Sequence, residues 1–155
     1  MKYQAGDYMA VHLTPIWRER ANLVFAAHHG TKDGKNEWEQ LWGAEITPTR
    51  CLVCCIPFFV HDVSLGDEVE IDEKFVLQRV IQRSGQVTFR VWFGDGWVNN
   101  REIILREVED MKILMEFYSE NLLALSVFHD GAQEVADYLH LQEQHGLLRY
   151  ETGRS

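Results

Sequence analysis

The chain has 155 residues, 46% hydrophobic and 25% charged, which suits one globular domain or two small ones and excludes a disordered protein. Its net charge of -9 repels phosphate, so nucleic acid and anionic membranes are poor partners and a basic protein is a favourable one. No apolar run is long enough to span a membrane and the first 20 residues lack a signal-peptide core, which predicts a cytosolic protein.

The first half of the chain has the pattern of short strands separated by polar turns. Residues 1–20 predict an N-terminal arm or a first edge strand, and the polar run from His28 to Asn36 predicts a loop. Five further segments have strand character: 21–27, 37–46, 50–56, 68–71 and 75–82. We expect them to curl into a small β-barrel-like domain over residues 1–84, which ends at the Ser84-Gly85 break.

The second half has a more regular pattern. The expected elements are a strand, a helix, two strands, a helix that Asp130 caps and Gly146 ends, and a last strand: 86–93, 99–112, 113–118, 122–128, 130–145 and 147–151. This β-α-β-β-α-β order is the split βαβ unit of the ferredoxin-like fold. The sequence therefore predicts an α+β protein, with a ferredoxin-like domain over residues 85–155.

The strand over residues 86–93 has two distinct faces. One face carries apolar residues at every second position and predicts a core: Val87, Phe89, Val91 and Phe93. Thr88, Arg90 and Trp92 lie on the other face, which in a ferredoxin-like sheet can bind RNA. The aromatic, glycine and basic run typical of such binding is missing, and the second half is acidic. That same face can instead pack against the first half.

Three short motifs carry a resemblance to a known family: Ile56-Pro57-Phe58-Phe59, Leu65-Gly66-Asp67-Glu68-Val69 and Arg83-Ser84-Gly85. Together they resemble a family of small bacterial proteins, the domain-of-unknown-function family 4265, over roughly Leu23 to Glu151. The resemblance implies no assigned activity, although members look similar to accessory or immunity-type proteins that neutralise a partner. The Cys54-Cys55 pair and the His28-His29 pair depart from the family's pattern.

The motif residues also have a reading in terms of folding alone. Pro57 ends the apolar strand, and Phe58 and Phe59 are expected to point to opposite sides, one into the barrel end and one toward the second half. Gly66 permits the positive φ of a tight turn, and Asp67 can bind the backbone of its own turn. We therefore predict that these five residues are structural.

The three cysteines, Cys51, Cys54 and Cys55, are the first candidates for a metal or redox site. They lie inside a predicted strand, where alternation separates Cys54 from the other two, so burial in the core is the better interpretation. A zinc site would need a histidine such as His28, His29 or His61, and the candidate set is Cys51, Cys54 and His28. We expect neither a metal nor a cofactor, and an odd cluster of cysteines does not predict disulfides.

No group of residues predicts catalysis. His61, Asp62 and Ser64 are the residue types of a hydrolase triad, but such triads assemble from distant segments around an oxyanion hole. The turn before the helix at residue 99 contains two glycines and no lysine, which is a weak phosphate signal. The sequence predicts no catalytic residue and no enzymatic activity.

Acidic residues concentrate in the second half, which carries 12 acidic and 6 basic side chains after Ser84. The candidate partner-binding residues are these acids and one tryptophan: Trp97, Glu102, Glu109, Asp110, Glu116, Glu120, Glu134 and Asp137. The leading hypothesis is a cytosolic binding protein of immunity or antitoxin type that neutralises a basic partner. The alternatives are a small-ligand sensor built on the ferredoxin-like half and a metal or redox protein built on the cysteines.

Overall fold

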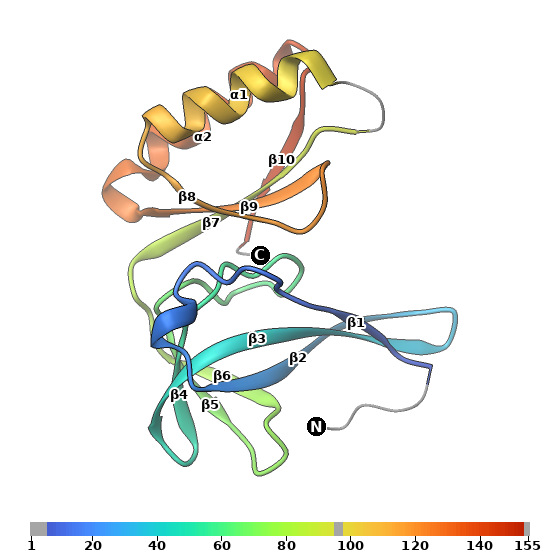
Figure 1. The fold of residues 1–155 in the computed structure, drawn as a ribbon, viewed down its shortest axis with the longest axis vertical. Coiled ribbons are helices and arrows are strands. Elements are labelled where there is room, and N and C mark those ends of the chain that lie inside the picture. Colours follow the sequence, from blue (N-terminus) through green and yellow to red (C-terminus); the bar gives the residue numbers. More distant parts are fainter. Residues whose placement is uncertain (1–5, 95–97, 154–155) are drawn as a thin grey trace.

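The computed structural model describes residues 6–94 and 98–153, which form two β-sheets lying one above the other (Figure 1). The first sheet contains β1 (Tyr8–Ala10), β2 (Leu23–Lys32), β3 (Lys35–Thr47), β4 (Arg50–Val53), β5 (Glu68–Ile71) and β6 (Leu77–Gln82). The second contains β7 (Gln86–Trp92), β8 (Leu114–Phe117), β9 (Leu122–Phe128) and β10 (Arg149–Thr152). Helices α1 (Val98–Asp110) and α2 (Ala132–Gln144) complete the fold, so the prediction of an α+β protein is confirmed.

The long strand β3 is the spine of the first sheet. It pairs with β2 along most of its length, with β1 at Glu37–Glu39 and with β4 near its end, and β5 and β6 follow beyond β4. The sheet curls until Ala26 of β2 forms an isolated bridge with Val76. This single bridge does not pair β2 with β6 as strands, so the sheet, which was predicted to be barrel-like, curls but does not close into a barrel.

The hairpin between β2 and β3 replaces the loop predicted over residues 28–36. Strand β2 continues to Lys32 and β3 begins at Lys35, so the turn consists of Asp33 and Gly34 alone. Both turn residues have positive φ, 54° and 74°, as a two-residue type I′ hairpin requires. The prediction was wrong because polar composition does not distinguish a loop from an exposed hairpin, whereas Asp-Gly is itself a strong hairpin signal.

The second sheet has the strand order β10-β7-β9-β8, and every neighbouring pair is antiparallel. Both described helices cover one face of it (Figure 1). The predicted apolar face of β7 is confirmed, because Phe89, Val91 and Phe93 are buried in the core beneath these helices. No helix in the described part of the chain is both long and apolar enough to cross a membrane.

The ends of several elements differ from the prediction. The strand expected over 50–56 ends at Val53, because the chain turns away from β5 before Pro57. Asp130 does not cap α2: it lies in a short 3-10 helix, and the residue at the helix start, Gly131, makes no side-chain cap. The C-terminal glycine is confirmed, since Gly146 has a φ of 75° and donates to a carbonyl of the last turn.

The turn between β2 and β3 gives a test of its backbone conformation. A Cβ at Gly34 would meet no atom within 4 Å, so the cost of Gly34→Ala comes from the positive φ alone. We expect the free energy of unfolding to fall by about 1–2 kcal/mol, and Gly34→Asn to cost less because asparagine tolerates this region. Urea unfolding of both variants measures the difference; equal losses would contradict the assigned turn.

Candidate functional site

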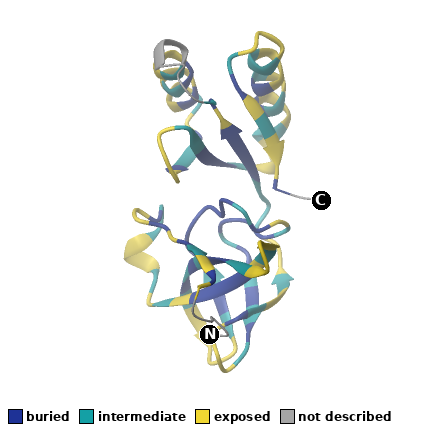
Figure 2. Cartoon of the chain, turned by 90° about the vertical axis from the view of Figure 1, so that its right-hand side faces the viewer, coloured by how far each residue is buried: buried dark blue, intermediate teal, exposed yellow. Residues whose placement is uncertain are grey.

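The helix-free face of the second sheet packs directly on the first half. Figure 2 shows buried segments of the first half next to this sheet. The face carries buried polar side chains from three strands: Thr88 and Arg90 of β7, Glu116 of β8 and Ser126 of β9. On the other side lies the junction segment, residues 54–67, which connects β4 to β5. The polar face of β7 therefore packs on the first half. This is the alternative to RNA binding that the sequence left open for this face.

Glu39 of β3 is completely buried and binds the backbone of the junction segment. Its Oε2 accepts a hydrogen bond from the Phe58 N–H at 2.7 Å, and its Oε1 accepts from the N–H groups of Phe59 and Val60, each at 3.0 Å. The chain leaves strand β4 after Val53, so these N–H groups have no sheet partner, and a buried N–H without an acceptor is costly. The carboxylate takes the place of the missing strand.

His12 connects this carboxylate to the second half. Its Nε2 lies 2.7 Å from Glu39 Oε2, and its Nδ1 lies 2.8 Å from Glu116 Oε1 on β8. Glu116 also accepts hydrogen bonds from the backbone N–H groups of Ile16 and Ile56 through Oε2. One imidazole therefore joins β3, β8 and the N-terminal segment in a single buried network.

The environment keeps the imidazole of His12 charged. Burial lowers its pKa, but the neighbouring Cys55 thiol and the carboxyl groups of Glu116 and Glu39 outweigh burial and raise the pKa to about 12. Burial likewise raises the pKa of Glu39, yet hydrogen bonds from His12 and from backbone N–H groups bring it below its ordinary value. The pair is a buried imidazolium–carboxylate bridge at neutral pH.

Aromatic rings surround this network on the side of the junction segment. Phe58 is buried and stacks on His12, with ring centroids 4.2 Å apart and planes 8° from parallel. Phe59 stacks on His29 at 5.2 Å, and both phenylalanine rings contact Tyr118 edge-on at 5.3 and 5.0 Å. The two rings were expected to point to opposite sides, but both meet the second half through Tyr118.

The turn at Gly66 and Asp67 fixes the other end of the junction segment. Gly66 has a φ of 83°, as expected for a tight turn. The carboxylate of Asp67 is buried and accepts hydrogen bonds from the N–H of Ser64 at 2.9 Å and from that of Ser84 at 2.8 Å. The predicted bond to its own turn is therefore confirmed, and a second bond reaches the connection between the two sheets.

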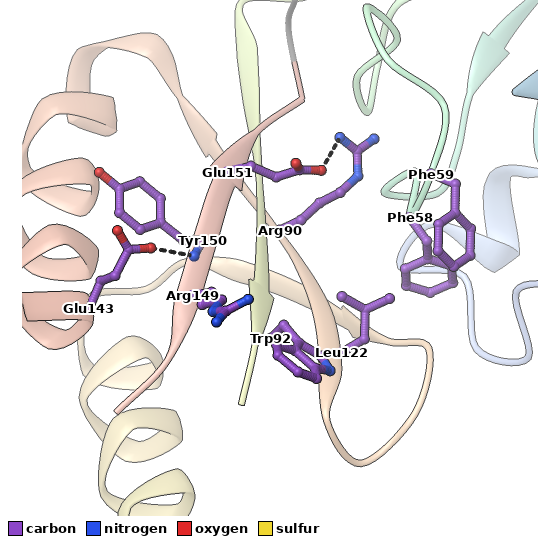
Figure 3. Close-up of a pocket in the computed structure, with 9 residues that line it drawn as sticks. All are labelled: Phe58, Phe59, Arg90, Trp92, Leu122, Glu143, Arg149, Tyr150 and Glu151. Atoms are coloured by element: carbon purple, nitrogen blue, oxygen red, sulfur yellow. Dashed lines mark hydrogen bonds and ion pairs between the residues drawn. The ribbon is translucent and has the colours of Figure 1, made fainter. Parts of the chain in front are cut away.

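A pocket of about 400 Å³ opens between the second sheet and the rings of the junction segment (Figure 3). We call it the junction pocket; it is lined by Phe58, Phe59, Arg90, Trp92, Leu122, Glu143, Arg149, Tyr150 and Glu151. This volume lies in the range of small-molecule sites, and the pocket has an apolar wall with a few charged groups, as such sites do.

Arg90 is the least satisfied group of the pocket. Its side chain is 4% exposed, and its Nη2 donates to the carbonyl of Val60. Among the described residues, neither Nε nor Nη1 has a hydrogen-bond acceptor, and the carboxylate of Glu151 stays 3.8 Å from Nη1. Burial lowers the pKa of the guanidinium, although arginine stays protonated in proteins. A buried cation with unsatisfied donors attracts a nearby anionic group.

The cysteines lie apart from this pocket. Cys51 and Cys55 are buried in the core of the first sheet, Cys54 is buried beside them, and all three are free. Burial raises the pKa of Cys51 to about 12 and that of Cys54 to about 11, and it also raises the pKa of Cys55. Burial thus keeps these thiols in their protonated form, which is a poor nucleophile.

The histidines considered for a metal site lie on the surface of the first half. His28, His29 and His61 line one cavity beside β6, and His28 Nε2 lies 3.1 Å from Asn36 Oδ1. Within residues 6–94 and 98–153, no three or more histidine, cysteine or acidic side chains are arranged to hold a metal ion. The structure does not bring His28 together with Cys51 and Cys54 in the core.

Six of the acidic candidates are exposed on the helices and on the turn of the β8–β9 hairpin: Glu102, Glu109, Asp110, Glu120, Glu134 and Asp137. Glu116 must be removed from this set, because it is 3% exposed and its carboxyl group is held by His12 and two backbone N–H groups. Trp97 lies outside the described residues.

Sequence reasoning missed the residues of the buried network. Glu39 is in phase with Leu41 on β3, and Glu116 is in phase with Leu114 on β8, so each places a charge at an apolar position of its strand. A charge in the inward phase is a sign of a buried ionic site. His12 gave no such sign, because it lies in a segment without periodicity.

Comparisons with known proteins support the fold. The model of a family described as a domain of unknown function, DUF4265, matches residues 39–150. A solved structure described as a hypothetical protein from Neisseria gonorrhoeae is similar, with a TM-score of 0.71 and 19% sequence identity. The match covers 84% of this chain and 93% of that one. No curated protein matches.

The charged state of His12 predicts how stability depends on pH. The folded protein keeps a proton that the unfolded chain releases above pH 6.5, so the stabilisation by His12 is complete below pH 6.5 and decreases toward pH 12. Relative to His12→Gln, the wild-type free energy of unfolding should fall by up to about 1.4 kcal/mol per pH unit.

Urea unfolding from pH 6.5 to pH 9 measures this difference. His145→Gln, at an exposed position just after α2, is the matched control. Its free energy of unfolding should change with pH as that of the wild type does. A constant gap between the wild type and His12→Gln over this range would contradict a buried imidazolium.

Proposed function

Since the chain belongs to the DUF4265 family, whose description names no activity, we propose a function from the junction itself: the protein binds a small organic molecule in the junction pocket and serves as a ligand sensor. One observation carries the proposal. The pocket brings the rings of Phe58 and Phe59 against a buried arginine whose Nε and Nη1 have no acceptor in the described part of the chain.

The walls of the pocket come from both halves of the protein. The junction segment supplies Phe58 and Phe59, whereas β7, β9, β10 and α2 supply the other lining residues (Figure 3). A ligand there contacts both halves at once and stabilises the arrangement in which they are packed. This is how a pocket between two sheets can report the presence of its ligand to the rest of the molecule.

The second half is proposed to be a ferredoxin-like module that carries the sensing face. The strand order β10-β7-β9-β8, with helices on one face, supports this assignment. In such an arrangement helices cover one face of the sheet, and the other face is available for contacts with a ligand or with another part of the protein. Here the available face holds both the buried network and the junction pocket.

Ligand-dependent stabilisation tests the proposal. In a thermal-shift screen of amino acids, nucleotides and organic acids, we expect a saturable rise in Tm, worth about 2.7 kcal/mol of unfolding free energy at a hundredfold excess over Kd. Leu122→Trp, which fills the pocket, should abolish the shift. Leu141→Trp, the same change at an exposed site on α2, should leave it intact. The proposal would be contradicted if no compound in the screen gave a saturable rise in Tm. It would also be contradicted if Leu122→Trp left the rise in Tm unchanged.

The second candidate function is that of an immunity-type protein that neutralises a basic partner. The six exposed acids on the helices and the β8–β9 turn favour this function. The helices lie on the face of the second sheet that is turned away from the first half (Figure 1). Complementary charge on such a surface mainly accelerates association and makes it sensitive to salt.

Co-purification with the products of neighbouring genes tests this second function. We expect a stoichiometric basic protein that dissociates at high salt and is lost when the six acids are replaced by their amides. A partner that the amide variant retains with unchanged affinity would show that charge does not direct the docking.

A further inference from the structure

The junction pocket contains charges of both signs. Four charged side chains line it, two basic and two acidic: Arg90, Arg149, Glu143 and Glu151. Two of them are already engaged, because Glu143 accepts the N–H of Tyr150 at 3.0 Å and the guanidinium of Arg149 lies 5.7 Å from the ring centre of Trp92. Arg90 and Glu151 form an ion pair with each other, but Nε and Nη1 of Arg90 make no hydrogen bond among the described residues, so this pair is the one that a ligand can engage.

These two residues are cross-strand neighbours on β7 and β10. They form an ion pair in which Arg90 Nη1 and Glu151 Oε1 are 3.8 Å apart, a distance too long for a hydrogen bond. The side chain of Glu151 is 58% exposed, whereas that of Arg90 is 4% exposed and donates to the carbonyl of Val60. The pair is a buried cation beside an exposed carboxylate.

The rest of the pocket is apolar. Phe58 and Phe59 face Trp92 and Leu122 across it (Figure 3). Aromatic rings here offer faces and edges for an apolar or aromatic group of the ligand. The charged pair and the apolar wall together define what the ligand must carry.

We infer that the ligand of the junction pocket is a free α-amino acid with an apolar or aromatic side chain; the inference rests on the proposed function and names its ligand class. The α-carboxylate of the amino acid takes the open donors of Arg90, and the α-ammonium, one carbon away, takes the carboxylate of Glu151. The side chain lies among Phe58, Phe59 and Trp92.

A zwitterion fits the charge of the site better than a simple ion does. An anion that binds Arg90 leaves Glu151 close to its negative charge, and the chain as a whole carries -9. A cation that binds Glu151 leaves Arg90 buried with its donors still open, which is costly. Only a ligand with both charges satisfies both residues.

Three related probes separate the contributions of the two charges. L-phenylalanine carries both, 3-phenylpropionate lacks the ammonium, and L-phenylalaninamide lacks the carboxylate. Isothermal titration of the full chain should give a Kd for L-phenylalanine at least tenfold lower than for either analogue. L-alanine, which has both charges but no ring, should also bind more weakly.

Glu151→Gln is the decisive variant because it removes the charge of a side chain that is 58% exposed and keeps its size. We expect it to weaken L-phenylalanine and L-phenylalaninamide about tenfold and to strengthen 3-phenylpropionate, because a negative charge near the bound carboxylate is removed. Glu73→Gln, at an exposed position between β5 and β6, is the matched control and should bind all probes as the wild type does. Arg90→Gln should weaken L-phenylalanine and 3-phenylpropionate but not the amide.

Each contrary result points to a different failure. Equal affinities for L-phenylalanine and 3-phenylpropionate, or no effect of Glu151→Gln, would overturn recognition of the ammonium. If no probe binds while another compound binds in a manner sensitive to Leu122→Trp, the amino-acid assignment is wrong and the proposed function stands. If nothing binds at all, both are wrong.

Discussion

The packing of the two halves depends on one buried charge, the imidazolium of His12 between Glu39 and Glu116. Ionised groups lose several kcal/mol of hydration when they are buried, and their attraction compensates only where hydrogen bonds fill the remaining positions. Here they do, because backbone N–H groups of the junction segment occupy the other oxygens of both carboxyl groups. The network therefore determines where the junction segment lies and which face of the second sheet covers it.

The pocket is a product of the same constraint. Because Glu39 binds the N–H groups of residues 58–60, the rings of Phe58 and Phe59 are held at the edge of the second sheet and the carbonyl of Val60 turns toward Arg90. The ring positions and the one engaged nitrogen of Arg90 are thus set before any ligand arrives. Such preorganisation reduces the entropy that binding must overcome.

The sequence predicted the parts of the fold that depend on local pattern. Strands β5 and β9 occupy the expected residues, and the two faces of β7 were identified, because alternation with a period of two reports burial directly. The β2–β3 hairpin was missed for a local reason, since its polar residues were given more weight than the Asp33-Gly34 turn.

The functional site could not be predicted in the same way. His12 and Glu116 are 104 residues apart, and Arg90 and Val60 are 30 apart, so no window of sequence contains both members of either contact. Sequence pattern placed Arg90 on a polar face but could not show that this face would be buried. The motif at Phe58 and Phe59 was recognised, whereas the carboxylate that positions it was not.

The separation of His12 from Glu116 also affects how the chain is made. On a ribosome, extending the chain by the 104 residues from His12 to Glu116 takes on the order of 5–20 s. During that interval the first half has Glu39 to pair with His12, but the N–H groups of Ile16 and Ile56 still lack their acceptor. The nascent protein thus presents an unfinished polar surface, which closes only when β8 emerges, and this delay is the period in which it is most exposed to wrong association.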